Sequence, residues 1–204
     1  GNEKPIRDVG GTNHGLVSFA RALEMSSNVG ISQLVYNIYN KKRADFSKDL
    51  KEYFAFEPLG LNIKVHEPKP KIGSSENPTD LLRMSFGYVS RMTPLQILTF
   101  YNAIANKGVM VKPQFVQSVV KDGKEVERFA PIIMSEAICK RETIDKLHNV
   151  LKGVVQNGTG RRLKTASYGI AGKSGTAEIG YDKKHAGIQH RASFVVFFPA
   201  DVLW

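Results

Sequence analysis

The strand expected at residues 168–177 ends in the run Ala171-Gly172-Lys173-Ser174-Gly175-Thr176-Ala177. A second, apolar strand is expected at residues 192–198, and the polar residues 180–189 join the two. Strands joined in this way can pair as an antiparallel sheet. The chain before this sheet shows mainly helical periodicity, so it is helix-rich first and strand-rich last. That order predicts an α+β fold, with a helical subdomain beside an antiparallel sheet.

Helices are expected where apolar side chains recur at helical spacing. The clearest start is Thr93-Pro94-Leu95-Gln96, a capping box with proline at the first helical position, and Gly108 marks the end. The run Met25–Gly30 breaks the periodicity, because serine and asparagine side chains compete for backbone hydrogen bonds. The expected helical ranges are 16–23, 31–38, 46–54, 93–108 and 143–155.

The remaining segments are expected to be irregular or extended. Prolines punctuate residues 58–78 and predict a long irregular stretch. Residues 109–120 are expected to be extended, and Lys121-Asp122-Gly123-Lys124 predicts a hairpin turn, because Asp-Gly tolerates positive φ. Residues 1–13 are polar and glycine-rich, and we expect a flexible start or an added lead-in there. Residues 14–204 are then one partial domain.

Composition restricts the classes of function. The 204 residues are 42% apolar and 24% charged, which favours one folded domain. Lysine plus arginine outnumber acids 29 to 19, a balance that suits an anionic polymer but is more simply a basic surface. No basic stripe alternates with aromatic residues, so nucleic acid is not an expected partner. The single Cys139 excludes an internal disulfide and a cysteine-based zinc site, and the five histidines lack paired metal spacing. No metal or cofactor is therefore expected.

One alternative for the lysine motif is nucleotide binding. Gly172-Lys173-Ser174 also matches the end of a phosphate-binding P-loop. A P-loop needs a glycine five residues before Gly172, but that position is Ser167. It also needs a helix directly after the Lys-Ser pair, whereas residues 177–181 lead into a loop. The nucleotide alternative is therefore not favoured.

A second interpretation combines Lys173-Ser174-Gly175-Thr176 with Ser26-Ser27-Asn28 as an acyl-transfer site. The lysine and the strand hydroxyls can bind a substrate carboxylate, and Gly175 lets a substrate backbone approach the strand. Ser26 can pass a proton, and Asn28 can hold a substrate amide. The simpler alternative is that the serines cap a helix and that the lysine is exposed. The acyl-transfer interpretation requires both motifs to meet as two walls of one groove.

The order Ser-x-Asn and then Lys-[Ser/Thr]-Gly resembles that of serine acyltransferases that recognise penicillin. The flanking segments are similar to those of class B penicillin-binding proteins, and to the septal, cell-division subgroup more than to the elongation subgroup. The resemblance covers about residues 12–200 and implies the transpeptidase/β-lactamase-like fold, incomplete at both ends. The segments that carry it are Glu24–Gly30, Ser85–Tyr88, Met92–Gln96, Ala103–Gly108, Gly158–Gly160 and Ala171–Ala177.

The resemblance implies a peptidoglycan D,D-transpeptidase that cross-links stem peptides ending in D-Ala-D-Ala and binds β-lactams. The resemblance implies that Ser26 relays a proton and that Asn28 binds an amide of the substrate. It also implies that Lys173 places a positive charge beside the lysine of the Ser-x-x-Lys motif. Ser174 and Thr176 would hold the terminal carboxylate, and the Thr176 N–H would form half of an oxyanion hole. It also implies division or elongation membrane proteins as partners, and a membrane-anchored parent on the extracytoplasmic, periplasmic face.

The sequence departs from the family at the nucleophile. The family's Ser-x-x-Lys should precede Ser26, and none lies there. The formal match Ser118-Val119-Val120-Lys121 comes after Ser26 in an extended run, whereas the family nucleophile opens a buried helix. We therefore expect a truncated fragment, inactive by itself, of a parent enzyme. Two alternatives stay open: a non-catalytic cell-wall or division scaffolding module, and a β-lactamase-like hydrolase. Ser26-Ser27-Asn28 fits class B synthases better than the Ser-Asp-Asn of class A lactamases.

Overall fold

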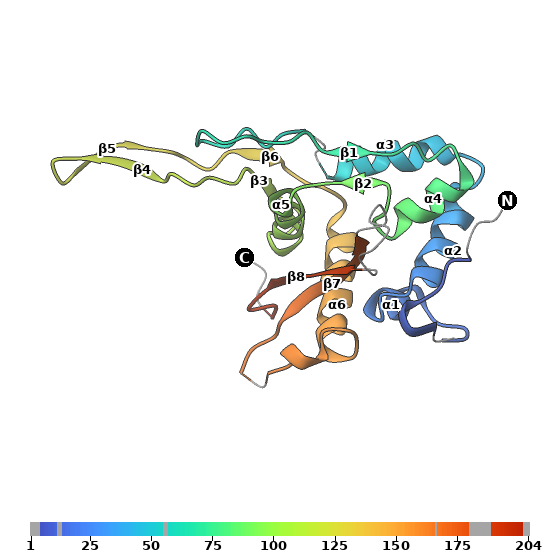
Figure 1. Cartoon of the computed structure of the whole chain (residues 1–204). Coiled ribbons are helices and arrows are strands. Elements are labelled where there is room, and N and C mark those ends of the chain that lie inside the picture. The colour runs from blue at the N-terminus through green and yellow to red at the C-terminus, as the bar shows by residue number, and fades with distance from the viewer. Residues whose placement is uncertain (1–4, 12–13, 55–56, 166, 180–188, 202–204) are drawn as a thin grey trace.

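The computed structural model describes residues 5–11, 14–54, 57–165, 167–179 and 189–201 (Figure 1). The helices are α1 (Phe19–Glu24), α2 (Asn28–Tyr39), α3 (Arg43–Tyr53), α4 (Pro78–Ser85), α5 (Pro94–Ala105) and α6 (Arg141–Gln156), with 3-10 turns η1 (Val9–Gly11) and η2 (Arg161–Leu163). The strands are β1 (Lys71–Ile72), β2 (Ser90–Arg91), β3 (Met110–Val111), β4 (Ser118–Lys121), β5 (Lys124–Arg128), β6 (Ile133–Ser135), β7 (Ala171–Ile179) and β8 (Gln189–Phe197). No helix in these described ranges combines the length and apolar character that crossing a membrane requires.

The sheet that carries the lysine motif consists of β7 and β8, which pair antiparallel along their whole lengths. Lys173 lies opposite Val195, and Thr176 lies opposite Ala192. Helix α6 packs along β7 behind this sheet (Figure 1). Gly172 is buried, and a Cβ placed there would lie 2.4 Å from the backbone oxygen of Val195. The close approach of the two strands therefore requires glycine at this position.

Two apolar clusters hold the elements together. The first lies between α5, α6 and the β7–β8 sheet, and its buried members are Ile104, Leu151, Ala171 and Ala200. The second lies between α3 and α4, and its buried members are Phe46, Leu81 and Met84, with Val35 of α2 packed against them. Burial of a large apolar side chain contributes about 1.5–3 kcal/mol. One core therefore joins the β7–β8 sheet to α5 and α6, and the other joins α2, α3 and α4.

The hairpin of β4 and β5 extends away from the rest of the molecule (Figure 1). Residues 119–128 are all exposed. Asp122 and Gly123 turn the chain with φ angles of 53° and 75°, so the hairpin turn predicted from Asp-Gly is confirmed.

Several predicted elements are confirmed. The capping box opens α5: Thr93 Oγ1 accepts the N–H of Gln96, and Gln96 Oε1 accepts the N–H of Thr93 at 2.8 Å. Helices α3 and α6 are present, although α3 begins at Arg43 rather than at residue 46 and α6 begins at Arg141 rather than at residue 143. The two C-terminal strands are present, although β7 begins at Ala171 rather than at residue 168. Of the loop expected at 180–189, residues 180–188 lie outside the described ranges.

Other predictions were wrong in their bounds. Helix α1 begins at Phe19 rather than at residue 16, and α2 begins at Asn28 rather than at residue 31. Helix α4 begins at Pro78, at the end of a stretch that was expected to be irregular. Asn77 is its N-cap, so Pro78 occupies the first helical position instead of breaking a helix. Within the run 109–120, only β3 and β4 are strands. Strand β3 pairs with β6, and β4 pairs with β5. Neither partner strand was predicted, because short exposed strands carry little periodic signal.

Candidate active site

The bend between α1 and α2 places Ser26 in the left-handed backbone region, with a φ angle of 58°. The N–H of Ser26 donates to Leu23 O at 3.2 Å, and the N–H of Ser27 donates to Ala22 O at 2.9 Å. These two bonds form a Schellman ending of α1, in which the left-handed residue is usually glycine. A serine in this conformation is strained by about 1–2 kcal/mol. The strain marks Ser26 as a candidate functional residue.

Ser27 and Asn28 begin the next helix. Ser27 Oγ accepts the N–H of Gly30 at 3.0 Å, so Ser27 is the N-cap of α2, and the helix-capping alternative is confirmed for this serine. Asn28 is the first residue of α2, and its Nδ2 donates to the backbone oxygen of Arg7 at 3.2 Å. The turn from α1 into α2 is therefore fixed on both sides of Ser26.

Lys173 reaches this bend from the middle of β7. Its Nζ donates to Ser26 Oγ at 2.7 Å and to the backbone oxygen of Ser174 at 3.0 Å. Ser26 and Lys173 are separated by 147 positions in the sequence. The prediction that the two motifs meet is confirmed. The alternative of an exposed strand lysine is wrong, because Lys173 is half-buried and directed at the bend.

The surroundings of Lys173 change its acid–base chemistry. Burial lowers the pKa of Lys173 from 10.5 to about 8, because the charged ammonium loses water there. A lysine with such a pKa exchanges its proton close to neutral pH. Because the ammonium donates to Ser26 Oγ, the hydroxyl hydrogen of Ser26 is left for another acceptor. A perturbed amine beside a strained hydroxyl is typical of acid–base sites.

A third segment, Gly158-Thr159-Gly160 after α6, joins the bend to β7. The N–H of Thr159 donates to Glu24 O at 3.3 Å, and its Oγ1 lies 2.7 Å from Ser174 Oγ. A Cβ on Gly158 would lie 2.1 Å from the same Glu24 oxygen, so only glycine permits this contact. Thr159 is not among the predicted site residues. The glycines on both sides of it are the signal that could have identified it.

The other predicted site residues lie at the edge of this arrangement. Gly175 and Thr176 are exposed on β7, one and two positions after Ser174. A Cβ on Gly175 would lie 2.7 Å from Ser193 Oγ on the neighbouring strand. The roles predicted for Ser26, Asn28, Lys173, Ser174, Gly175 and Thr176 stay predictions.

Two competing sequence patterns do not form sites. Lys173 and Ser174 lie inside a strand that continues to Ile179, so the helix that a P-loop needs is not present after them. Ser118 and Lys121 lie at the two ends of β4, where Lys121 is exposed. The described residues contain no group of three or more histidine, cysteine, aspartate or glutamate side chains placed to hold a metal ion.

Sequence comparison relates this geometry to a known domain. The family model for the penicillin-binding protein transpeptidase domain matches residues 1–202. The chain belongs to this family. Stage V sporulation protein D of Bacillus subtilis is 29% identical to the chain over 198 residues, which cover 92% of the chain and 29% of that protein. The predicted family is confirmed, whereas the septal subgroup stays a prediction.

Solved transpeptidase domains share the fold. The D,D-transpeptidase domain of a peptidoglycan glycosyltransferase from Eggerthella lenta matches with a TM-score of 0.78 at 24% identity, covering 96% of this chain and 48% of that one. Penicillin-binding protein A of M. tuberculosis, solved as a ceftriaxone acyl-enzyme complex, matches with a TM-score of 0.78 at 23% identity, covering 96% and 43%. The chain therefore spans under half of each solved chain, and 29% of the sporulation protein. The predicted α+β transpeptidase fold is confirmed.

Proposed function

We propose that this chain supplies two walls of the acyl-transfer site of a serine-type peptidoglycan D,D-transpeptidase. The observation that carries the proposal is the 2.7 Å hydrogen bond between Lys173 Nζ and Ser26 Oγ. It brings together the two family motifs that sequence leaves far apart. Membership of the transpeptidase domain family supports the reaction class.

The proposed reaction is two successive acyl transfers. A serine hydroxyl oxygen attacks the carbonyl carbon of the penultimate D-alanine of a stem peptide. The C–N bond to the terminal D-alanine breaks, and the departing amine takes the proton that the serine gave up. An amine of a neighbouring stem then attacks the ester carbon. The C–O bond breaks, and the proton lost by that amine returns to the serine oxygen.

Ser26 and Lys173 form the proposed proton path. Ser26 passes its hydroxyl proton to the departing amine, Lys173 replaces that proton through the 2.7 Å bond, and the proton that the nucleophilic serine gave up returns to Lys173. A pKa near 8 allows Lys173 to give and regain a proton at neutral pH. The positive charge of Lys173 also favours the neutral form of a nearby lysine beside the nucleophile.

The exposed part of β7 is the proposed substrate-binding wall. The hydroxyls of Ser174 and Thr176 donate to the terminal carboxylate, and the bond from Thr159 orients Ser174. Gly175 leaves space for the substrate backbone beside the strand. The N–H of Thr176 supplies one oxyanion donor, and Asn28 holds a substrate amide. β-Lactams, which imitate D-Ala-D-Ala, are proposed to occupy the same wall.

The nucleophile is proposed to belong to a Ser-x-x-Lys segment joined to this chain. Within the 204 residues, that pattern occurs only from Ser118 to Lys121 on the exposed hairpin. We therefore propose that the 204-residue chain by itself forms no acyl-enzyme. Residues 14–204 are proposed to be part of one transpeptidase domain, and residues 1–13 are proposed to lead into it, with Asp8 bonded to the start of α2.

Fluorescent penicillin tests this proposal on denaturing gels. The 22.6 kDa chain should show no covalently labelled band, whereas the parent protein that contains a Ser-x-x-Lys segment should label. In the parent, Lys173→Ala should slow labelling by about 100-fold, within the range of an acid–base group. Lys121→Ala removes an exposed lysine and should leave labelling unchanged. A labelled 22.6 kDa band, or equal labelling of the two variants, would contradict the proposal.

Membership of the family is the support for a proposed cellular setting. We place the parent protein at the extracytoplasmic, periplasmic face of the bacterial inner membrane, where its substrate is assembled. Membrane proteins of division or elongation are its proposed partners. Protease treatment of intact spheroplasts should remove the domain, and protection from protease would contradict this location.

A further inference from the structure

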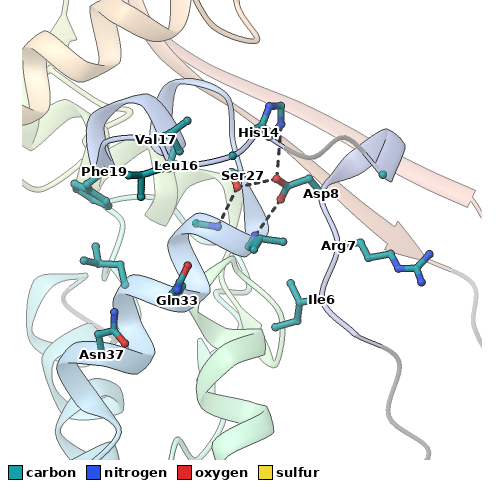
Figure 2. A pocket seen from close by; sticks show the side chains of 16 residues that line it. Ile6, Arg7, Asp8, His14, Leu16, Val17, Phe19, Ser27, Gln33 and Asn37 are labelled. Atoms are coloured by element: carbon teal, nitrogen blue, oxygen red, sulfur yellow. Dashed lines mark hydrogen bonds and ion pairs between the residues drawn. The ribbon is translucent and has the colours of Figure 1, made fainter.

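Asp8 lies against the N-terminal end of α2, at the edge of an open pocket of about 680 Å³ (Figure 2). Its carboxylate is buried, with 8% of the side chain exposed. Oδ2 accepts the hydroxyl proton of Ser27 at 2.8 Å, and Oδ1 accepts the N–H of Val29 at 3.0 Å. His14 Nε2 lies 3.7 Å from Oδ2 on the other side. A residue 18 positions before Ser26 thus contacts the turn that carries the serine.

These contacts provide hydrogen-bond acceptors for N–H groups in the first turn of α2. A helix begins with backbone N–H groups that have no partner within the helix. Asp8 accepts one of these from Val29, and Ser27 accepts the next from Gly30 at 3.0 Å. A carboxylate at this end of a helix is also favoured by the helix dipole, by about 0.3–1 kcal/mol. The backbone oxygen of Arg7, the neighbour of Asp8, accepts from Asn28 Nδ2.

The bonds to Asp8 fix the turn just after Ser26. Ser27 and Val29 are held by one carboxylate, so the backbone between them cannot rotate without breaking one of these two bonds. Ser26 precedes this clamp in a left-handed conformation, with a φ angle of 58°. Such a conformation persists only where the surroundings hold it. On its other side, the Schellman bonds of α1 complete the restraint.

We propose that Asp8 is a positioning residue that holds the Ser26 hydroxyl against Lys173 Nζ through Ser27 and Val29. Asp8 touches neither atom of that pair and acts on it through the backbone. The catalytic consequence rests on the proposed function, whereas the geometric statement does not. Loss of the carboxylate should let the bend relax and should admit water around the lysine.

The test is the titration of Lys173 by NMR in the 204-residue chain with ¹³C-labelled lysine. The Lys173 signal is assigned by its absence in Lys173→Gln. In Asp8→Ala, the midpoint should rise from about 8 toward the ordinary value of 10.5, as burial is lost. Removal of a negative charge alone has the opposite sign, since it disfavours the ammonium. A rise therefore reports movement of the bend.

Asp49→Ala is the matched control. Asp49 Oδ2 accepts the hydroxyl of Tyr39, the last residue of α2, at 2.8 Å, so the variant also removes a carboxylate bonded to a hydroxyl of this helix. It should lower the melting temperature without moving the Lys173 midpoint. An unchanged Lys173 midpoint in folded Asp8→Ala would overturn the proposal.

A milder variant decides the question if Asp8→Ala does not fold. In Asp8→Asn, the side-chain oxygen can still accept from Val29, whereas the amide nitrogen cannot accept from the Ser27 hydroxyl and can only donate to its Oγ. A smaller rise of the Lys173 midpoint, absent in Asp49→Asn, supports the positioning role, and equal midpoints in the two variants overturn it. The titration needs no acylation, so its outcome is independent of the penicillin-labelling test.

Discussion

Two antiparallel strand pairs, β4–β5 and β7–β8, place their lysines in different surroundings. The β7–β8 sheet packs on α6 and contributes the buried Ala171 to the core. The β4–β5 hairpin extends from the molecule with residues 119–128 exposed. Lys173 reaches a hydroxyl on another element, whereas Lys121 lies opposite Lys124 beside the turn. The difference between the two strand pairs is therefore the packing of α6 behind β7, which accompanies the contact of Lys173 with a hydroxyl of another element.

The same two regions show that a sequence motif does not by itself form a site. Ser118 and Lys121 match Ser-x-x-Lys within four residues, and the fold leaves this pair on an exposed strand. Ser26 and Lys173 belong to two motifs that lie 147 positions apart, and the fold joins them by a 2.7 Å hydrogen bond. A serine and a lysine become a candidate site only when tertiary packing removes water from around them.

The largest expected effect comes from the charge of Lys173. Its folded-state pKa of about 8 lies below the ordinary 10.5, so between these values the unfolded chain binds more protons. The free energy of unfolding, relative to Lys173→Met, should therefore be constant below pH 8 and rise by about 2–3 kcal/mol toward pH 10.5. Urea unfolding at a series of pH values measures this.

Lys121→Met is the matched control for that experiment, because it removes a lysine from the exposed hairpin. It should leave the pH-dependent rise in place. If the unfolding free energies of the unsubstituted chain and of Lys173→Met differ by the same amount at every pH, Lys173 is not buried as described. The difference between the two strand pairs is then contradicted.

The next effect tests how tightly each hairpin is packed. Gly172→Ala places a Cβ against the Val195 backbone oxygen and the Phe194 ring, and overpacking of this kind costs about 2 kcal/mol. Gly123→Ala meets no atom within 4 Å, and its φ of 75° costs about 1 kcal/mol. Urea unfolding should rank Gly172→Ala as the more destabilised. Equal losses would show that β7 and β8 separate easily.

The smallest effect concerns two residues with left-handed backbones. Asp122→Gly in the exposed turn should stabilise the chain by about 0.5 kcal/mol, because it relieves strain without losing a partner. Ser26→Gly relieves similar strain but removes the hydroxyl bonded to Lys173, so we expect a net loss of about 1 kcal/mol. Thermal unfolding measures both. A stabilised Ser26→Gly would mean that the bond to Lys173 contributes little.

Local chemistry made part of this fold predictable. The capping box at Thr93 and the Asp122-Gly123 turn formed as expected, because their hydrogen bonds lie within a few residues. Helix α6 was predictable from its apolar face. Helix α4 was not, because Asn77-Pro78 is as typical of a turn as of a helix start.

The site was predictable only through its two motifs. Ser26 and Lys173 were paired because the family order suggested it, and the structure brings them together. Thr159 and Asp8 were missed, because each acts through bonds to distant backbone or hydroxyl groups. Sequence periodicity carries no signal for such contacts, and only the two glycines beside Thr159 mark its position.

The contact between Gly158 and Glu24 has a consequence for ligand binding. Because the carbonyl of Glu24 rests on the glycine that follows α6, while β7 packs along the same helix, one rigid support carries both Ser26 and Lys173. The spacing between hydroxyl and amine is thus preorganised, and a ligand loses little affinity to ordering of this part of the protein.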